Sequence, residues 1–259
     1  MELEGKVAVI TGGGSGIGKA TAMLFAKEGA KVTVVARTQA DIDRTAEEIK
    51  RDGGEALAVR GDISRPEDMQ HVYSETEKRW GRLDIVFAHA GVNGVWAPIE
   101  EIEPDEWNKT ISINLNGTFH TVKYAVPLLK RNGGSVIITS SINGTRLFHN
   151  AGASAYSSSK AGQIAFMKMM ALELAKYRIR VNAICPGAID TSVEQRTERR
   201  DTERAEEPAH YPAGSIPLTD GKPGRPEQVA QLVLFLASDR SNHITGTPVW
   251  IDGAESLLE

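Results

Sequence analysis

The chain has 259 residues, of which 41% are hydrophobic and 25% are charged, so it carries enough apolar side chains for one large core. A formal net charge of −4 gives no basic footprint for nucleic acid, and the single cysteine, Cys185, excludes an intrachain disulfide and fits a reducing compartment. Acidic residues stand where a signal peptide would be basic, and no apolar run approaches the roughly 20 residues that span a bilayer. We therefore expect a cytoplasmic protein with no membrane partner.

Short apolar runs rich in β-branched residues alternate along the chain with longer amphipathic stretches. The short runs predict strands at residues 6–10, 31–35, 56–59, 83–87, 135–139, 179–184 and 248–251. The longer stretches predict helices at residues 18–28, 41–51, 66–80, 106–131, 154–177 and 226–238. Strands that are apolar on both sides and alternate with helices are typical of a parallel sheet covered on both faces. One pattern from end to end predicts a single α/β domain over residues 1–259.

Several of the predicted helices carry signals at their ends. Gly29 follows the first helix as a natural stop. Ser64 is placed to cap the N-terminus of the third helix, with Pro66 in its first turn. Pro127 lies inside the long fourth helix, so we expect a kink or break near the end of that helix.

Residues 190–224 depart from the alternating pattern. Positions 194–207 mix six acidic residues with four arginines, which favours a solvated helix with ion pairs between its side chains. A long insertion between core elements is also typical of a lid over a binding site. The two interpretations are compatible, and we expect a substrate lid here.

A glycine-rich turn, Thr11–Gly18 (TGGGSGIG), joins the first strand to the first helix. Glycine permits a tight turn and lets the backbone approach a pyrophosphate, whose charge is stabilised at a helix N-terminus. The spacing TGxxxGxG differs from GxGxxG, and no Lys-Ser/Thr pair completes a P-loop, so an ATPase or GTPase is not expected. The predicted nucleotide contacts are Gly12, Ser15, Gly16, Ile17 and Gly18.

The end of the second strand indicates which nucleotide is bound. An acid at this place binds the ribose 2′-hydroxyl of NAD, whereas this chain has Ala36 and Arg37. A guanidinium can bind a 2′-phosphate through a forked, charge-assisted contact, so we predict NADP(H) over NAD(H), with NAD(H) still possible. After the third strand, Asp62 is placed to accept a hydrogen bond from the adenine amino group, with Ile63 beside it. An ordinary surface arginine and an ordinary turn acid remain the alternatives.

Together, several motifs resemble those of the short-chain dehydrogenase/reductase family, and the resemblance covers nearly the whole chain. The motifs are Thr11–Gly18, Ala90-Gly91, Asn114, Ser141, Tyr156 with Lys160, and Pro186-Gly187. The family implies a one-domain Rossmann fold, doubly wound around a seven-stranded parallel sheet with helices on both faces. It also implies a nicotinamide cofactor and a homo-oligomer, either a dimer or a tetramer.

The proposed reaction centre pairs Tyr156 with Lys160, four residues further along one helical face. A tyrosine with a pKa of about 10 is a poor proton shuttle at pH 7, and a nearby cation favours the phenolate and lowers that pKa. By resemblance, Lys160 also holds the nicotinamide ribose, and Ser141 donates to the substrate oxygen. The resemblance also implies that Asn114 distorts its helix and holds a water on the proton path. Ser140, adjacent to Ser141, fits the role of donor to the substrate oxygen less well.

The remaining predicted contacts come from three loops. The family's Asn-Ala-Gly after the fourth strand is His89-Ala90-Gly91 here; a structural tie by the histidine remains possible, beside the adenosine ribose. After the sixth strand we expect Pro186, Gly187, Ile189 and Thr191 at the nicotinamide. By resemblance, Arg146, Phe148 and His149 can shape the substrate pocket, although His149 also reads as a plain loop residue. No Cys/His cluster suggests zinc or another metal.

These observations predict an NADP(H)-dependent oxidoreductase that transfers hydride between the nicotinamide and a carbonyl or secondary alcohol. A 3-oxoacyl-carrier-protein reductase is one alternative, for which Lys130, Arg131 and Arg178 could form a basic patch. A sugar dehydrogenase resembling glucose 1-dehydrogenase is another. A nucleotide-sensing protein without chemistry is the remote one, because Asn114 and the other three catalytic residues are all present.

Overall fold

Parallel strands form the centre of the molecule, and the computed structural model describes residues 1–148, 150–191, 197–206 and 216–258. The seven strands of the main sheet are β1 Val7–Thr11, β2 Lys31–Ala36, β3 Glu55–Arg60, β4 Ile85–Ala88, β6 Gly134–Thr139, β7 Ile179–Pro186 and β9 Pro248–Ile251. Their order is β3-β2-β1-β4-β6-β7-β9, and every neighbouring pair is parallel. The predicted seven-stranded parallel sheet is confirmed.

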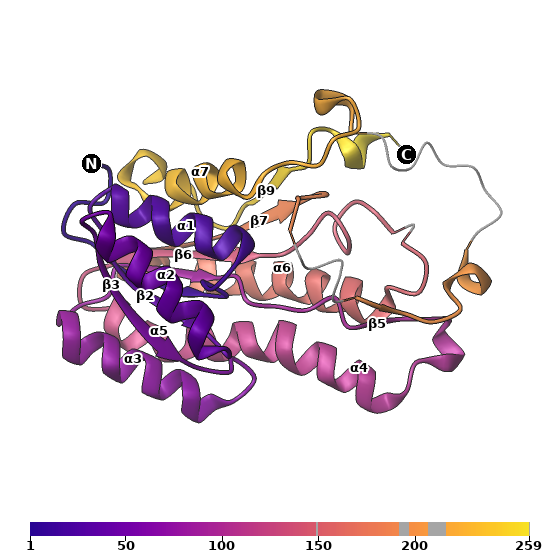
Figure 1. The fold of residues 1–259 in the computed structure, drawn as a ribbon, viewed down its shortest axis with the longest axis horizontal. Helices are drawn as coiled ribbons and strands as arrows, with labels where there is room; N and C mark the ends of the chain where they lie inside the picture. Colours follow the sequence, from indigo (N-terminus) through magenta and orange to yellow (C-terminus); the bar gives the residue numbers. More distant parts are fainter. Residues whose placement is uncertain (149, 192–196, 207–215, 259) are drawn as a thin grey trace.

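Helices cover both faces of this sheet (Figure 1). They are α1 Gly16–Lys27, α2 Gln39–Arg51, α3 Pro66–Trp80, α4 Pro104–Ile111, α5 Gly117–Leu129, α6 Ser154–Leu174 and α7 Pro226–Ala237. Buried side chains of α1, α2 and α7 form one hydrophobic core with the sheet, and those of α3, α5 and α6 form a second core on the other face. Two separate cores on one sheet are the doubly wound arrangement expected for this α/β fold.

The long helix predicted at residues 106–131 is wrong in one respect. The chain forms α4 and α5 with a π-helical turn, Ser112–Asn116, between them. The break therefore lies at Asn114 and not near Pro127, which is inside α5 two residues before that helix ends. A π turn adds a residue to the helical repeat, and such turns are frequent at functional sites.

Two further expectations about local structure need correction. The N-cap of α3 is Arg65, because the Ser64 hydroxyl donates to Asp62 Oδ1 at 2.7 Å instead of capping the helix. Within the predicted lid, described residues 197–206 form the short strand β8 Glu198–Arg199 and a 3₁₀ turn, Thr202–Ala205. The solvated helix expected at 194–207 is thus wrong over these residues, and residues 192–196 and 207–215 lie outside the described part.

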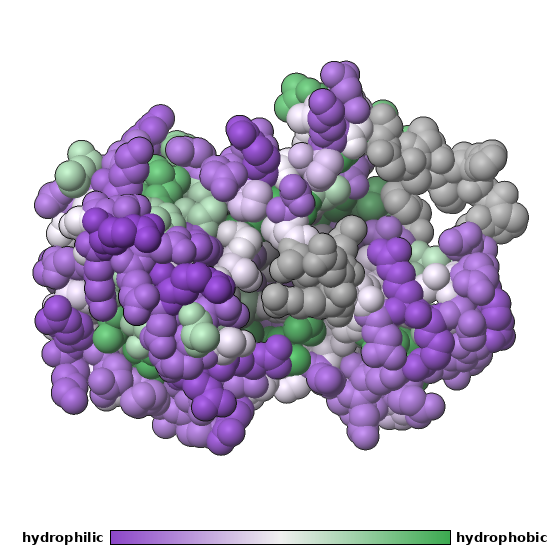
Figure 2. Space-filling model, viewed as in Figure 1, coloured by the Kyte–Doolittle hydropathy of each residue, from purple (hydrophilic) through white to green (hydrophobic). Residues whose placement is uncertain are grey.

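The surface seen in Figure 2 is largely hydrophilic, with small separate hydrophobic patches. Among the described residues, no helix is long and apolar enough to cross a membrane. Strand order reverses between β1 and β4, where the chain leaves the β1-β2-β3 half for the β4-β6-β7-β9 half. In open parallel sheets, ligands bind at the carboxyl ends of the strands at this reversal, so the site is sought there.

Candidate active site

The glycine-rich turn lies at the carboxyl end of β1, and three of its positions favour glycine, two by their backbone angles and one by lack of space. Gly12 and Gly16 have φ angles of +74° and +51°, the left-handed region that favours glycine. A Cβ on Gly18 would lie 2.2 Å from the Gly12 carbonyl oxygen, so a side chain there would open the turn. Helix α1 begins at Gly16, with Ser15 as its extended N-cap, and Ile17 is buried in the core beneath. A narrow turn that ends at a helix N-terminus fits a dinucleotide pyrophosphate.

The end of β4 is tied to the glycine-rich turn and to β6. Backbone N–H groups of His89 and Ala90 donate to Thr11 Oγ1 at 3.0 and 3.2 Å. The His89 ring nitrogen Nδ1 lies 3.0 Å from Thr139 Oγ1. Burial, with a smaller effect from the Lys160 charge, lowers the pKa of His89 to about 3, so this ring is neutral. The structural tie expected of the histidine in place of asparagine is confirmed.

Asn114 joins three elements at the π turn. Its Nδ2 donates to the Val92 carbonyl at 2.9 Å and to Ser159 Oγ at 3.0 Å, and its Oδ1 accepts from the Val92 N–H at 2.8 Å. Its backbone carbonyl accepts from Gln163 Nε2 at 2.9 Å. Asn114 and Gln163 are fully buried. Sequence reasoning missed Gln163, whose only signal was an amide among the apolar residues of its helix.

The space beside Gly91 connects Asn114 with Lys160. A Cβ placed on Gly91 would lie 3.0 Å from Asn114 Oδ1 and 3.7 Å from Lys160 Nζ. A side chain would therefore fill the gap between the amide oxygen and the ammonium.

Lys160 and Tyr156 share one face of α6, as predicted. The Lys160 ammonium lies 5.5 Å from the centre of the Tyr156 ring and donates to the Thr139 carbonyl at 2.9 Å. Loss of hydration lowers the pKa of Lys160 to about 8, since only 4% of the residue is exposed. Loss of hydration also raises the pKa of Tyr156, while a hydrogen bond with Ser141 acts weakly in the other direction. In the protein by itself, the pKa of Tyr156 is therefore shifted in the direction opposite to the one expected from Lys160, and the lowering expected with bound nucleotide stays a prediction.

The two adjacent serines at the end of β6 have different partners. The Ser141 hydroxyl lies within hydrogen-bond reach of Tyr156 and accepts from the Asn143 N–H at 3.1 Å. The Ser140 hydroxyl donates to the Lys160 backbone carbonyl at 2.8 Å. Ser141 thus faces the phenol and Ser140 ties the strand to α6, in line with the preference for Ser141.

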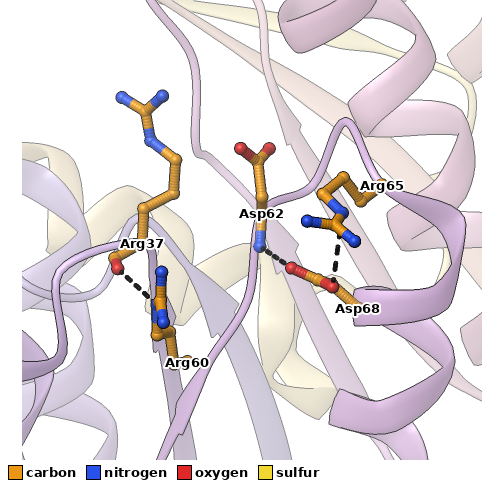
Figure 3. A pocket seen from close by; sticks show the side chains of 5 residues that line it. All are labelled: Arg37, Arg60, Asp62, Arg65 and Asp68. Atoms are coloured by element: carbon orange, nitrogen blue, oxygen red, sulfur yellow. Dashed lines mark hydrogen bonds and ion pairs between the residues drawn. The ribbon is translucent and has the colours of Figure 1, made fainter.

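Beyond the second strand, Arg37, Arg60, Asp62, Arg65 and Asp68 line a pocket of about 120 Å³ (Figure 3). The parallel pairing of β2 with β3 brings the first two arginines together, and Arg60 Nε donates to the Arg37 carbonyl at 3.1 Å. Arg65 is paired with Asp68 and a neighbouring glutamate. Among the described residues no side chain pairs with the Arg37 guanidinium, which extends in the same direction as the Asp62 carboxylate (Figure 3).

The loop that carries Asp62 is held by hydrogen bonds between its backbone N–H groups and two aspartate side chains. Asp62 N–H donates to Asp68 Oδ2 at 2.9 Å, and Asp62 Oδ1 accepts from the Ser64 N–H at 2.9 Å. Ile63 is buried, and a Cβ on Gly117 would lie 2.6 Å from its Cδ1 atom. Asp62 is therefore held at the pocket rim, whereas Ile63 packs into the start of α5.

The segment after β7 crosses the glycine-rich turn. Gly187 packs against the loop after β9, and Ile189 forms an isolated parallel bridge with Gly224. A Cβ on Gly16 would lie 3.3 Å from Thr191 Cγ2. Pro186 is the last residue of β7, so this segment leaves the sheet at the edge where the other candidate residues gather.

Arg146 and Phe148 are two of the three residues expected to shape the substrate pocket. The Arg146 guanidinium stacks over the Trp250 ring at 3.6 Å, and Phe148 is 69% exposed. His149 lies outside the described residues. In the part of the chain that the structure describes, no group of three or more His, Cys, Asp or Glu side chains is arranged to hold a metal ion.

A doubly wound fold with a glycine-rich turn and a Tyr-Lys pair is typical of one class of oxidoreductase, and comparison with known proteins gives the same class. A family model described as enoyl-(acyl carrier protein) reductase matches residues 12–254. The chain belongs to the short-chain dehydrogenase/reductase family, and it is an NAD(P)-dependent oxidoreductase that acts on CH–OH groups and the corresponding carbonyls.

Three similar proteins illustrate the relationship. The chain is 37% identical over 254 residues to a 3-oxoacyl-[acyl-carrier-protein] reductase, FabG, of Thermotoga maritima, with 98% of each chain covered. It is 48% identical to a crystal structure of a 3-ketoacyl-ACP reductase from Sinorhizobium meliloti 1021, with a TM-score of 0.93, covering 98% of this chain and 100% of that one. It is 32% identical to a 3-ketoacyl-(acyl-carrier-protein) reductase from Brucella melitensis complexed with NADH, with a TM-score of 0.86, covering 98% and 99%.

Proposed function

We propose that the protein is an NADP(H)-dependent reductase of small carbonyl compounds in which Tyr156 transfers the proton. The observation that carries this proposal is the half-buried phenol within reach of Ser141, with the Lys160 ammonium 5.5 Å from its ring. When bound, the nicotinamide supplies the hydride to the carbonyl carbon. Tyr156 gives its proton to the carbonyl oxygen, and the Ser141 hydroxyl donates a hydrogen bond to the same oxygen.

The raised pKa of Tyr156 suits the reductive direction, because a phenol must carry its proton in order to donate it. The phenolate left behind is stabilised by the Lys160 ammonium, which can pass a proton towards the space beside Gly91. Asn114 Oδ1 borders that space and supports the path. In the oxidative direction, the same groups accept the proton from an alcohol.

The preference for NADP(H) is supported by Arg37, whose guanidinium is exposed at the end of β2 and unpaired among the described residues. A 2′-phosphate would form a charge-assisted contact there, and no carboxylate stands at the strand end to repel it. We expect Arg37→Asp to lower kcat/KM for NADPH by about tenfold to a hundredfold, in line with the loss of one charged hydrogen bond. Kinetics with NADPH and NADH measure the change, and Arg51→Asp at the end of α2 is the control. An unchanged preference for NADPH would refute the role of Arg37.

A 3-oxoacyl thioester is the second candidate substrate, and the reductases of Thermotoga maritima and Sinorhizobium meliloti favour it. A carrier protein is acidic, so its docking needs free cations. Two arginines of the segment near the reaction centre, Arg200 and Arg204, are already paired with glutamates. We therefore infer that a small thioester would serve as substrate more readily than one held on a carrier protein.

A homo-oligomer is also proposed, with a second copy on α5 and α6. Phe119, Met169 and Leu172 are 42%, 63% and 80% exposed on these helices, and the Phe119 ring packs edge-on against Phe166. Such exposed apolar side chains on adjacent helices are typical of an interface. Light scattering should show an oligomer that Met169→Glu dissociates; a wild-type monomer would refute the proposal.

The deciding experiment is a substrate panel with NADPH and NADH. Acetoacetyl-CoA, cyclohexanone and L-rhamnose with NADP⁺ represent the thioester, ketone and sugar classes. Tyr156→Phe should lower kcat by roughly a hundredfold or more while NADPH still binds, because only the proton donor is removed. Tyr177→Phe, just beyond the far end of α6, is the control. Binding of NADPH without turnover on the panel would favour the nucleotide-sensing alternative, and full activity of Tyr156→Phe would remove the mechanism.

A further inference from the structure

Two segments far apart in sequence are joined beside the reaction centre. We name residues 93–106 the first arm and residues 197–205 the second arm. Strand β5 Val95–Trp96 of the first arm pairs in parallel with β8 of the second (Figure 1). The Arg200 N–H donates to the Trp96 carbonyl at 2.9 Å, and Asn93 Nδ2 donates to Thr197 Oγ1 at 2.7 Å. The backbones of the two arms are thus in direct contact.

Arg200 adds a side-chain tie between the arms. Its two terminal nitrogens lie 3.1 and 2.9 Å from the two Glu106 carboxylate oxygens, and it also donates to the Glu101 carbonyl. The pair is partly buried, with 35% and 24% of the two side chains exposed. A bidentate guanidinium with a further carbonyl contact fixes orientation as well as charge, and lysine cannot reproduce it. Arg204 forms a second, more exposed pair with Glu100 and Glu101.

The residue that this tie fixes is Trp96. Its ring centre lies 6.3 Å from that of Tyr156 at a 45° tilt, and the Arg199 guanidinium lies over the Trp96 ring, 5.0 Å from its centre. Only 8% of Trp96 is exposed, and its indole N–H donates to the Asn93 carbonyl at 3.1 Å. The first arm also meets the loop before α6, where Ala97 N–H donates to the Gly152 carbonyl at 3.3 Å. The indole therefore forms a wall beside the phenol.

We propose that Trp96 is a specificity-determining residue that contacts the apolar part of the substrate next to the carbonyl, and that Arg200 is the positioning residue that holds it there through Glu106. An indole face favours flat or bulky apolar groups over small ones because it buries more of their surface. The proposal rests on Tyr156 as the proton donor, since the wall matters only where the carbonyl oxygen meets that phenol.

The first test measures the arms without any substrate. Hydrogen–deuterium exchange of backbone amides in residues 95–106 should become faster in Arg200→Gln and in Glu106→Gln. Arg240→Gln removes an exposed ion pair with Glu2, and both residues lie outside the two arms. This control variant should leave the exchange in residues 95–106 unchanged. Exchanging the charges, with Arg200→Glu and Glu106→Arg in one chain, should restore part of the protection. Equal exchange in wild type and Arg200→Gln would overturn the positioning role.

The second test separates an effect on substrate binding from an effect on nucleotide binding. With NADPH, Arg200→Gln should raise KM for cyclohexanone about tenfold, which is the effect expected from the loss of one partly buried charged contact. The KM for NADPH should stay within about twofold of the wild-type value. Trp96→Ala should lower the preference for cyclohexanone over acetone by a similar factor. Faster exchange in the arms with an unchanged KM for cyclohexanone would overturn the specificity role. Loss of activity in Tyr156→Phe is judged separately, so a failure of the proposed mechanism is distinguishable from a failure of this proposal.

Discussion

Replacing Lys160 by methionine should raise the stability of the protein in the absence of nucleotide while it removes activity. Burial lowers the pKa of this lysine from 10.5 to about 8, which corresponds to roughly 3 kcal/mol against folding at pH 7. The methionine loses the hydrogen bond to the Thr139 carbonyl, which costs about 1 kcal/mol. The net gain of about 2 kcal/mol corresponds to a rise of about 4 °C in Tm for a chain of this size.

The pH dependence gives this prediction its sign. The folded-state pKa of Lys160 lies below the unfolded one, so the unfolded chain binds more protons between about pH 8 and pH 10.5. The free energy of unfolding of the wild type is therefore highest, as far as Lys160 is concerned, above the unfolded pKa. It falls as the pH is lowered towards the folded pKa, because the buried amine must then take up a proton. The advantage of Lys160→Met should shrink from about 2 kcal/mol at pH 7 to near zero at about pH 9.5, where the wild-type lysine is largely neutral.

Urea unfolding at both pH values measures the effect, with tryptophan fluorescence as the signal. Lys168→Met is the matched control, because Lys168 is exposed on the same helix. Its effect should be small and independent of pH. A Lys160→Met protein that is less stable than wild type at pH 7, or whose advantage does not change with pH, would refute the reasoning that burial of the charged lysine destabilises the folded protein.

Other substitutions separate the roles of neighbouring residues. Ser141→Ala should lower kcat by at least tenfold with little loss of stability, whereas Ser140→Ala should cost about 1 kcal/mol in urea unfolding and keep most of the activity, because it removes only a tie to α6. Gly18→Ala should abolish NADPH binding in fluorescence titration, since its Cβ would lie 2.2 Å from the Gly12 carbonyl oxygen; normal binding would refute the tight turn. Asp84→Ala should cost about 3 kcal/mol of unfolding free energy, because the buried carboxylate accepts from the first strand's N–H and from a neighbouring arginine; a loss below 1 kcal/mol would refute this.

The architecture was predictable from the sequence because each buried strand is a run of apolar residues that can be recognised in the sequence. The strands at 6–10 and 31–35 appear as Val7–Thr11 and Lys31–Ala36, within about a residue at each end. The glycine-rich turn was equally predictable, since its backbone geometry tolerates no other residue at Gly18. These features depend on local chemistry, which a single sequence contains.

Features that depend on contacts between distant residues were missed. The pairing of Val95–Trp96 with Glu198–Arg199 involves two strands of two residues each, too short for any period to appear. The charged run that contains Arg200 predicted a helix with internal ion pairs, but Arg200 and Arg204 bind glutamates of the 99–106 segment instead. The partners of a charge are set by the tertiary fold, so charge patterning alone could not identify them.

The reaction centre shows the same limit in its electrostatics. The four-residue spacing correctly placed Lys160 beside Tyr156, and proximity to a cation predicted a lowered tyrosine pKa. In the folded protein both groups lose hydration, which favours the neutral form of each and raises the pKa of Tyr156 while it lowers that of Lys160. The protein alone therefore presents a protonated phenol beside a lysine that gives up its proton easily. Such a pair is set to donate a proton to a carbonyl oxygen, and it reaches the phenolate only when a further positive charge or a bound substrate changes that balance.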